Sequence, residues 1–196
     1  LRGGHYITGT SGDGSSVSGG AIASQNFDAN YTGVSRFGDL FGRITNLNLF
    51  IARVTDADYI GEEKKNYFLG MVYGIRAFYY FDLYRIYGGV PLRLGVEVID
   101  GELDPTKLYL PRATPAEVMT QIKSDLQKSL EYFGNVNSFN PYGMGNKVYW
   151  NKAATESLIG EVYLWNAKVT TGNNTANPDD LAVAKQHLLN VVNNYG

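Results

Sequence analysis

The stretch Gly74–Leu92, GIRAFYYFDLYRIYGGVPL, decides the fold of this chain. It crowds tyrosine and phenylalanine rings together and ends abruptly in Gly-Gly-Val-Pro. Two explanations are open: a helix buried in an all-helical core, or an aromatic surface that binds a flat ligand. Gly88 and Gly89 offer a left-handed cap and Pro91 prevents further helix, so the pattern predicts a helix over about residues 61–87.

This predicted helix carries small residues on one face, at Gly70, Gly74 and Ala77. Because glycine costs about 1 kcal/mol relative to alanine inside a helix, their presence favours close approach by a second helix. Larger apolar side chains make another stripe at helical spacing: Phe68, Met71, Val72, Ile75, Tyr79, Leu83 and Ile86. A helix that is apolar on nearly every side is a buried one, so we interpret the rings mainly as core. Asp82 and Arg85 are spaced to pair with each other.

Four further helices are predicted around this one. Apolar residues at spacings of three and four begin near Ser35 and continue to Val54. Thr114 through Glu117 forms a capping box before a helix that ends at Gly134. The last two predicted helices resemble a tetratricopeptide-type pair in their spacing. The first runs from Lys152 to about Val169, and the second is capped at residues 177–180 and has apolar positions from Leu181 to Tyr195. The sequence therefore predicts an all-α fold of tetratricopeptide-like helix pairs with long irregular loops, chiefly over residues 90–113 and 135–150.

The chain divides in composition near residue 35. Residues 1–35 are rich in glycine and serine, which predicts an irregular segment, and residues 36–196 form the predicted helical domain. A helical repeat array that ends without a polar capping element leaves an apolar face open. We therefore expect the helical domain to be incomplete at its C-terminal end, with more protein after Gly196.

Charge and composition exclude several classes of function. The formal net charge is −2 and the pI is about 5.7, which argues against nucleic-acid binding and a polybasic membrane patch. The chain has no cysteine, so it has no disulfides, thiolate metal sites or cysteine nucleophile. His5 and His187 are far apart and neither has a second ligand at metal spacing. Gly12 and Gly14 lack the lysine of a phosphate loop, and we predict neither a metal nor a cofactor.

Catalysis is the first alternative, and the sequence argues against it. Adjacent acids occur near predicted helix starts, where negative charge complements the helix dipole: Asp56 and Asp58, Glu62 and Glu63, and Asp179 and Asp180. The two histidines do not lie near a nucleophile-elbow sequence. We therefore expect a protein that is not an enzyme.

Three segments resemble the SusD/RagB family in consistent order. Residues 76–92 resemble its hallmark Arg-Ala-aromatic-Tyr-Phe core with an aromatic-Gly-x-Val-Pro ending. Residues 110–126 resemble the block that begins with arginine and Thr-Pro and ends in Asp-Leu, and residues 151–164 resemble an alanine-rich helix. Together the likeness covers about residues 35–195.

The resemblance implies a non-catalytic nutrient-binding lipoprotein on the outer-membrane surface of Bacteroidetes. Such a protein captures a glycan, or sometimes a peptide, and delivers it to a SusC-like TonB-dependent transporter. Family members are much longer, so the chain is similar to their N-terminal portion. The lipidated cysteine of the family is absent from the chain, so membrane contact through a lipid anchor is inferred only.

Candidate ligand residues come from the physics of sugar binding. Sugar rings have apolar faces and a fringe of hydroxyls, so a binder needs aromatic planes beside amide and charged side chains. The candidates lie beside the Gly/Ser-rich segment: Tyr6, Phe27, Asn30, Tyr31 and Arg36. Tyr142 and Trp150 carry less weight, and each candidate has the alternative of a loop residue that shields a helix end. A helical-repeat module that binds peptides remains the alternative function.

Overall fold

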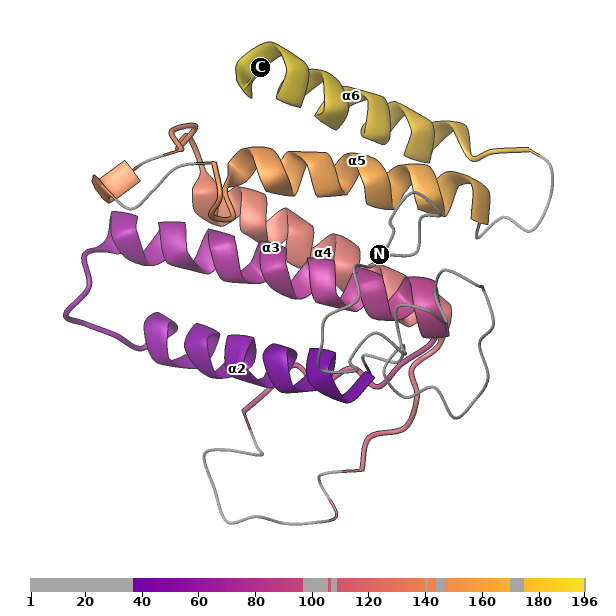
Figure 1. Cartoon of the computed structure of the whole chain (residues 1–196), viewed down its shortest axis with the longest axis horizontal. Helices are drawn as coiled ribbons and strands as arrows, with labels where there is room; N and C mark the ends of the chain where they lie inside the picture. Colours follow the sequence, from indigo (N-terminus) through magenta and orange to yellow (C-terminus); the bar gives the residue numbers. More distant parts are fainter. Residues whose placement is uncertain are drawn as a thin grey trace, which may run out of the picture. The chain divides into compact units, whose positions relative to one another are not determined.

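A computed structural model describes residues 37–96, 106, 109–139, 141–143, 147–169 and 175–195. The chain separates into two compact units, residues 1–41 and 42–196, and the contacts given below lie within the second. The elements in chain order are α2 (Phe37–Thr55), α3 (Glu62–Tyr87), α4 (Pro115–Phe133), the short 3-10 turn η3 (Pro141–Gly143), α5 (Lys152–Val169) and α6 (Pro178–Tyr195) (Figure 1). These residues include no strand, which confirms the predicted all-α class.

The helices pack as two antiparallel pairs. Helix α3 lies along α4, and α5 lies along α6 (Figure 1). Helix α4 also contacts α5, so the two pairs share one interior. This arrangement agrees with the predicted tetratricopeptide-like pairing.

The small-residue face of α3 is the face that the other helices approach most closely. A Cβ atom added at Gly74 would lie 2.1 Å from Nε1 of Trp150 and 3.0 Å from Oγ of Ser129. One added at Gly70 would lie 3.0 Å from the ring of Phe133. The stripe of small residues therefore makes room for α4 and for the tryptophan that precedes α5, as the sequence predicted.

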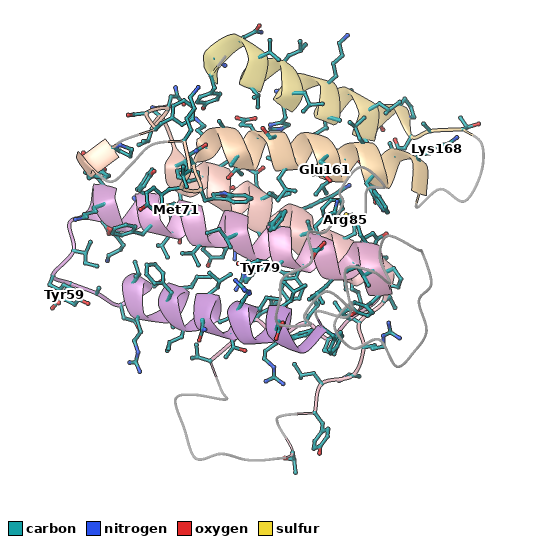
Figure 2. The ribbon with its side chains drawn as sticks, viewed as in Figure 1. Tyr59, Met71, Tyr79, Arg85, Glu161 and Lys168 are labelled. Atoms are coloured by element: carbon teal, nitrogen blue, oxygen red, sulfur yellow. The ribbon has the colours of Figure 1, made fainter. Side chains whose placement is uncertain are left out.

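The stripe of larger apolar residues on α3 is only partly in the core, contrary to expectation. Val72 and Leu83 are buried. Its other members are half-buried: Phe68, Met71, Ile75, Tyr79 and Ile86. Tyr79 lies on the α2 side of α3, where the Arg43 guanidinium is 6.0 Å from its ring centroid (Figure 2). Because α3 turns its small residues toward α4, the fully enclosed rings are instead Tyr80 and Phe81.

Local signals in the sequence set the ends of these helices. The Thr114 hydroxyl accepts a hydrogen bond from the Glu117 backbone N–H at 3.2 Å, and the Glu117 carboxylate accepts one from the Thr114 backbone N–H at 2.7 Å. This reciprocal pair is the predicted capping box. At the C-terminal end of α3, Gly88 has a φ of 69°, and its N–H donates to the Tyr84 carbonyl at 2.9 Å.

Replacing Thr114 with alanine should lower the free energy of unfolding by about 1 kcal/mol, because the first turn of α4 loses its side-chain acceptor. Urea unfolding followed by circular dichroism measures the change. Thr120 is the matched control, since its exposed hydroxyl bonds only the Ala116 carbonyl within the same helix. Equal losses for Thr114→Ala and Thr120→Ala would contradict a capping role.

Candidate ligand-binding site

The principal candidates from the sequence lie outside the described residues. This holds for Tyr6, Phe27, Asn30, Tyr31 and Arg36. Their assignment to ligand binding stays a prediction.

The two secondary candidates, Tyr142 and Trp150, both contact the helical scaffold. The Tyr142 ring packs edge-on against Tyr67 at 5.9 Å, and its backbone has a φ of 66°. The indole N–H of Trp150 donates to Oγ1 of Thr155 at 2.9 Å, and its ring lies 6.0 Å from Phe78. Trp150 therefore closes the start of α5, whereas Tyr142 keeps 43% of its surface exposed and stays accessible to a ligand.

A buried ionic network holds α2, α3 and α4 together. The Arg76 guanidinium donates to both oxygens of Asp125, each at 2.7 Å, and to Oδ1 of Asn48 at 2.8 Å. The Gln121 amide donates a further bond to Asp125 at 2.9 Å. Burial opposes the charge on Arg76, but the hydrogen bonds and charge of Asp125 outweigh it, so the pKa of Arg76 is raised. This arrangement satisfies a buried charge pair and leaves it no freedom to act on a ligand.

The same polar core holds the chain that follows α3. The Tyr80 hydroxyl donates to the Arg93 carbonyl at 2.8 Å and accepts from the Arg93 N–H at 2.9 Å. The Asn48 amide donates to the Arg93 carbonyl at 2.9 Å and to the Gly95 carbonyl at 3.4 Å. Burial raises the pKa of Tyr80 to about 12, so its phenol is neutral at physiological pH. Residues 93–95 are thus held at backbone atoms by side chains of α2 and α3.

A first surface hollow, the connector hollow, lies beside this held segment. Its volume is about 490 Å³. Its lining comes from the two ends of the connector: Leu92, Arg93, Leu94, Gly95, Thr106, Tyr109 and Leu110. Tyr109 is 85% exposed, and an exposed ring next to polar groups can contact the face of a sugar.

A second hollow, the α3–α4 hollow, opens where α3 begins and α4 ends. Its volume is about 390 Å³, and its lining is Asn66, Tyr73, Lys128, Glu131 and Tyr132. Sequence reasoning did not identify these residues as ligand contacts. The signal was present in their spacing, because residues seven apart on α3 and three or four apart on α4 share one helix face. The sequence did not indicate that these faces of α3 and α4 lie next to each other.

Most of the acidic residues considered as catalytic candidates lie in the first turn of a helix or bind another side chain. Glu62 and Glu63 lie in the first turn of α3. Asp180 begins α6 and binds the Lys123 ammonium at 3.1 Å and the Asn166 amide at 2.6 Å. The helix-start interpretation is confirmed for Glu62, Glu63, Asp179 and Asp180. It is wrong for Asp56 and Asp58, which follow the end of α2 at Thr55.

Neither a metal centre nor a membrane-spanning helix is found in the part of the chain that the structure describes. The described residues contain no group of three histidine, cysteine, aspartate or glutamate side chains arranged to hold a metal ion. None of the described helices combines the length and apolar character needed to cross a bilayer.

The Nδ1 of His187 pairs with Oε2 of Glu156, which links α6 to α5.

Comparison with protein families places most of the chain in one of them. Residues 15–171 match the SusD-like family described as "Starch-binding associating with outer membrane". A curated relative, SusD-like protein P38 of Formosa agariphila, is 33% identical over 91 residues, which are 46% of this chain and 16% of the relative.

Solved structures of similar proteins have a similar fold over most of this chain. A SusD superfamily protein of Bacteroides fragilis NCTC 9343 is 68% identical, with a TM-score of 0.80 over 100% of this chain and 38% of its own. NanU of B. fragilis is 33% identical, with a TM-score of 0.74 over 90% of this chain and 32% of its own. The chain thus spans well under half the length of these relatives.

Proposed function

The chain belongs to the SusD-like family of starch-binding, outer-membrane-associated proteins, and from this premise we propose that it captures a glycan nutrient without transforming it. The captured glycan passes to a SusC-like TonB-dependent transporter at the outer membrane, where the protein is exposed on the cell surface. In this proposal a lipid anchor provides its contact with the membrane. The observation that carries the proposal is the family match over residues 15–171.

The polar and aromatic surface of the described helices supports a binding role. Both hollows combine tyrosine rings with amide, hydroxyl or charged side chains, which is the chemistry that sugars require. Glycoside hydrolysis needs two carboxylates facing each other across a cleft, about 5–10 Å apart. Neither hollow is lined by two carboxylates, since Glu131 is the single acid among their residues. These features favour capture over catalysis.

A peptide-binding helical-repeat module is the second candidate, and one surface favours it. Helix α6 presents exposed apolar side chains, Leu181, Leu189 and Val192. An amphipathic peptide helix can lay its apolar face on such a row. Transfer to a transporter also requires a protein contact, so this surface is compatible with the first function.

Affinity electrophoresis of the 196-residue chain tests the two functions. The chain is run in native gels that contain starch, laminarin, mucin glycans or a plant xylan, beside a gel without polysaccharide. Slower migration in at least one polysaccharide gel is the expected result. Unchanged migration in every gel, together with binding to an immobilised peptide library, would support the peptide module instead.

Replacing Tyr31 with alanine should weaken binding to the polysaccharide identified in this way, with little change in melting temperature. The expectation follows from the position of Tyr31 beside the Gly/Ser-rich segment, where its ring is a candidate for contact with the face of a sugar. Gel retardation and thermal unfolding of the same sample give both values. A large drop in melting temperature would assign Tyr31 to the core and remove it from the ligand site.

A further inference from the structure

The α3–α4 hollow has walls of the kind that hold a single sugar ring. The rings of Tyr73 and Tyr132 stack almost parallel, with centroids 5.5 Å apart and an interplanar angle of 10°. Around them stand an amide on Asn66, an ammonium on Lys128 and a carboxylate on Glu131. The hollow is therefore lined by a stacked pair of phenols and by amide, ammonium and carboxylate groups that can form hydrogen bonds. Its volume of about 390 Å³ lies in the range of small-molecule sites.

The Tyr73 hydroxyl is the observation that points to a ligand. Tyr73 is only 9% exposed, yet its hydroxyl makes no hydrogen bond to any described residue. It is not sealed away either, because the Trp165 indole nitrogen is the one polar side-chain atom of the described residues that is enclosed without a partner. Buried polar groups are nearly always satisfied, so a hydroxyl left open on a hollow is available to a bound molecule. Burial raises the pKa of Tyr73, so this hydroxyl is a neutral donor.

The faces of the Tyr73 ring are already covered, which defines how a ligand can meet it. Tyr132 stacks on the ring, and the cations of Arg76 and Lys128 lie 5.0 and 5.3 Å from its centroid. Tyr73 therefore contributes its hydroxyl and not its face. The amide of Asn66 also has no hydrogen-bond partner within the described part of the chain, so two neutral polar groups are free at the hollow.

Charge around the hollow is balanced. Lys128 and Glu131 both line the hollow from α4, where the Glu131 carboxylate accepts a hydrogen bond from the Gln127 amide at 3.1 Å. Lys65 pairs with Glu62 at 3.8 Å on the first turn of α3. Glu62 is close enough to act on the Tyr132 phenol, together with Lys128 and Glu131. The two lysines and two glutamates balance in charge, so there is no net positive charge here to attract an acidic sugar. The recognition chemistry is that of a neutral, hydroxyl-rich ring.

We propose that the α3–α4 hollow is a subsite for one neutral hexopyranose unit of a glycan, separate from the N-terminal candidates. The Tyr73 hydroxyl and the Asn66 amide bond its hydroxyls, and Lys128 and Glu131 close the rim. The inference rests on the proposed glycan-binding function and adds the place and the class of sugar. A glycan that holds a second site of the protein at the same time gains a further point of attachment here, and linked contacts raise overall affinity.

The test removes one oxygen atom. Tyr73→Phe keeps the ring and its packing, so the melting temperature should stay unchanged while the Kd for the subsite rises about two- to tenfold, as the loss of one hydrogen bond predicts. Binding of maltoheptaose and laminarihexaose to the whole chain is measured by isothermal titration calorimetry. Asn66→Ala should weaken the same binding.

Two matched variants separate binding from folding. Tyr195→Phe removes a hydroxyl that donates to Oδ1 of Asn137 at 3.0 Å within the protein, so any effect should fall on the melting temperature and leave oligosaccharide affinity unchanged. Tyr59→Phe removes a hydroxyl from a side chain that is 84% exposed and should alter neither (Figure 2).

The outcomes divide clearly. Equal affinities of the chain and its Tyr73→Phe variant for both oligosaccharides would overturn the subsite, as would binding of sialyllactose but of neither neutral glucan. Retardation in a polysaccharide gel would still support the wider function in these cases. If the unmodified chain shows neither gel retardation nor calorimetric binding of an oligosaccharide, the subsite and the glycan-binding function are both rejected.

Discussion

Replacing Asp125 with alanine should lower the free energy of unfolding by about 3–5 kcal/mol, because it strands the Arg76 guanidinium in the core. The side chains of Arg76 and Asp125 are 5% and 0% exposed, and two hydrogen bonds of 2.7 Å join them. A buried charge without its partner keeps its desolvation cost and loses the interaction that offsets it. Urea unfolding by circular dichroism measures the loss.

A surface ion pair provides the control for this prediction. Arg85 binds Glu161 at 2.8 Å, but the Glu161 side chain is 52% exposed (Figure 2). Exposed pairs contribute about 0–1 kcal/mol, so Glu161→Ala should change stability little. The double variant Arg76→Met, Asp125→Leu should recover part of the loss, since it removes both charges. Similar small losses for Asp125→Ala and Glu161→Ala would show that the core does not depend on the buried pair.

Replacing Gly74 with leucine should lower the free energy of unfolding by about 1–3 kcal/mol through overpacking. The Cβ atom alone would lie 2.1 Å from Nε1 of Trp150. The tryptophan would have to move, and its hydrogen bond to Thr155 would be lost. The loss should exceed the gain of about 1 kcal/mol that a better helix former brings. Thermal and urea unfolding of the unmodified chain and of Gly74→Leu measure the difference in stability.

Gly42 on α2 is the matched position for this substitution. No atom lies within 4 Å of a Cβ built there. Gly42→Leu should therefore keep or raise the melting temperature. An unchanged melting temperature for Gly74→Leu would contradict the close approach of Trp150 and Ser129 to α3.

Local sequence signals were sufficient to predict the helices. The capping box at Thr114, the glycine after Tyr87 and Pro91 each act within a few residues, so the chain itself carries the information. The Asp82–Arg85 pair, observed at 3.3 Å, was predictable for the same reason. The two glycines of α3 also indicated where Phe133 of α4 and Trp150 approach that helix closely, before either partner was known.

Contacts between distant segments were beyond the reach of sequence reasoning. Arg76 and Asp125 are 49 residues apart, and nothing local to either identifies the other. The apolar stripe of α3 was assigned to the core because apolar side chains surround that helix, and only the position of α4 decides which of them are enclosed. The same limit applies to the α3–α4 hollow, since Tyr73 and Tyr132 meet only once the two helices pair.

The bonds from Tyr80 and Asn48 to Arg93 have a consequence for recognition kinetics. They fix the backbone that forms one side of the connector hollow. Residues 93–95 already have a fixed conformation before a molecule binds there. Little conformational entropy of these residues is therefore lost on binding. Association at this edge should therefore proceed in one step, at a rate set by diffusion and orientation.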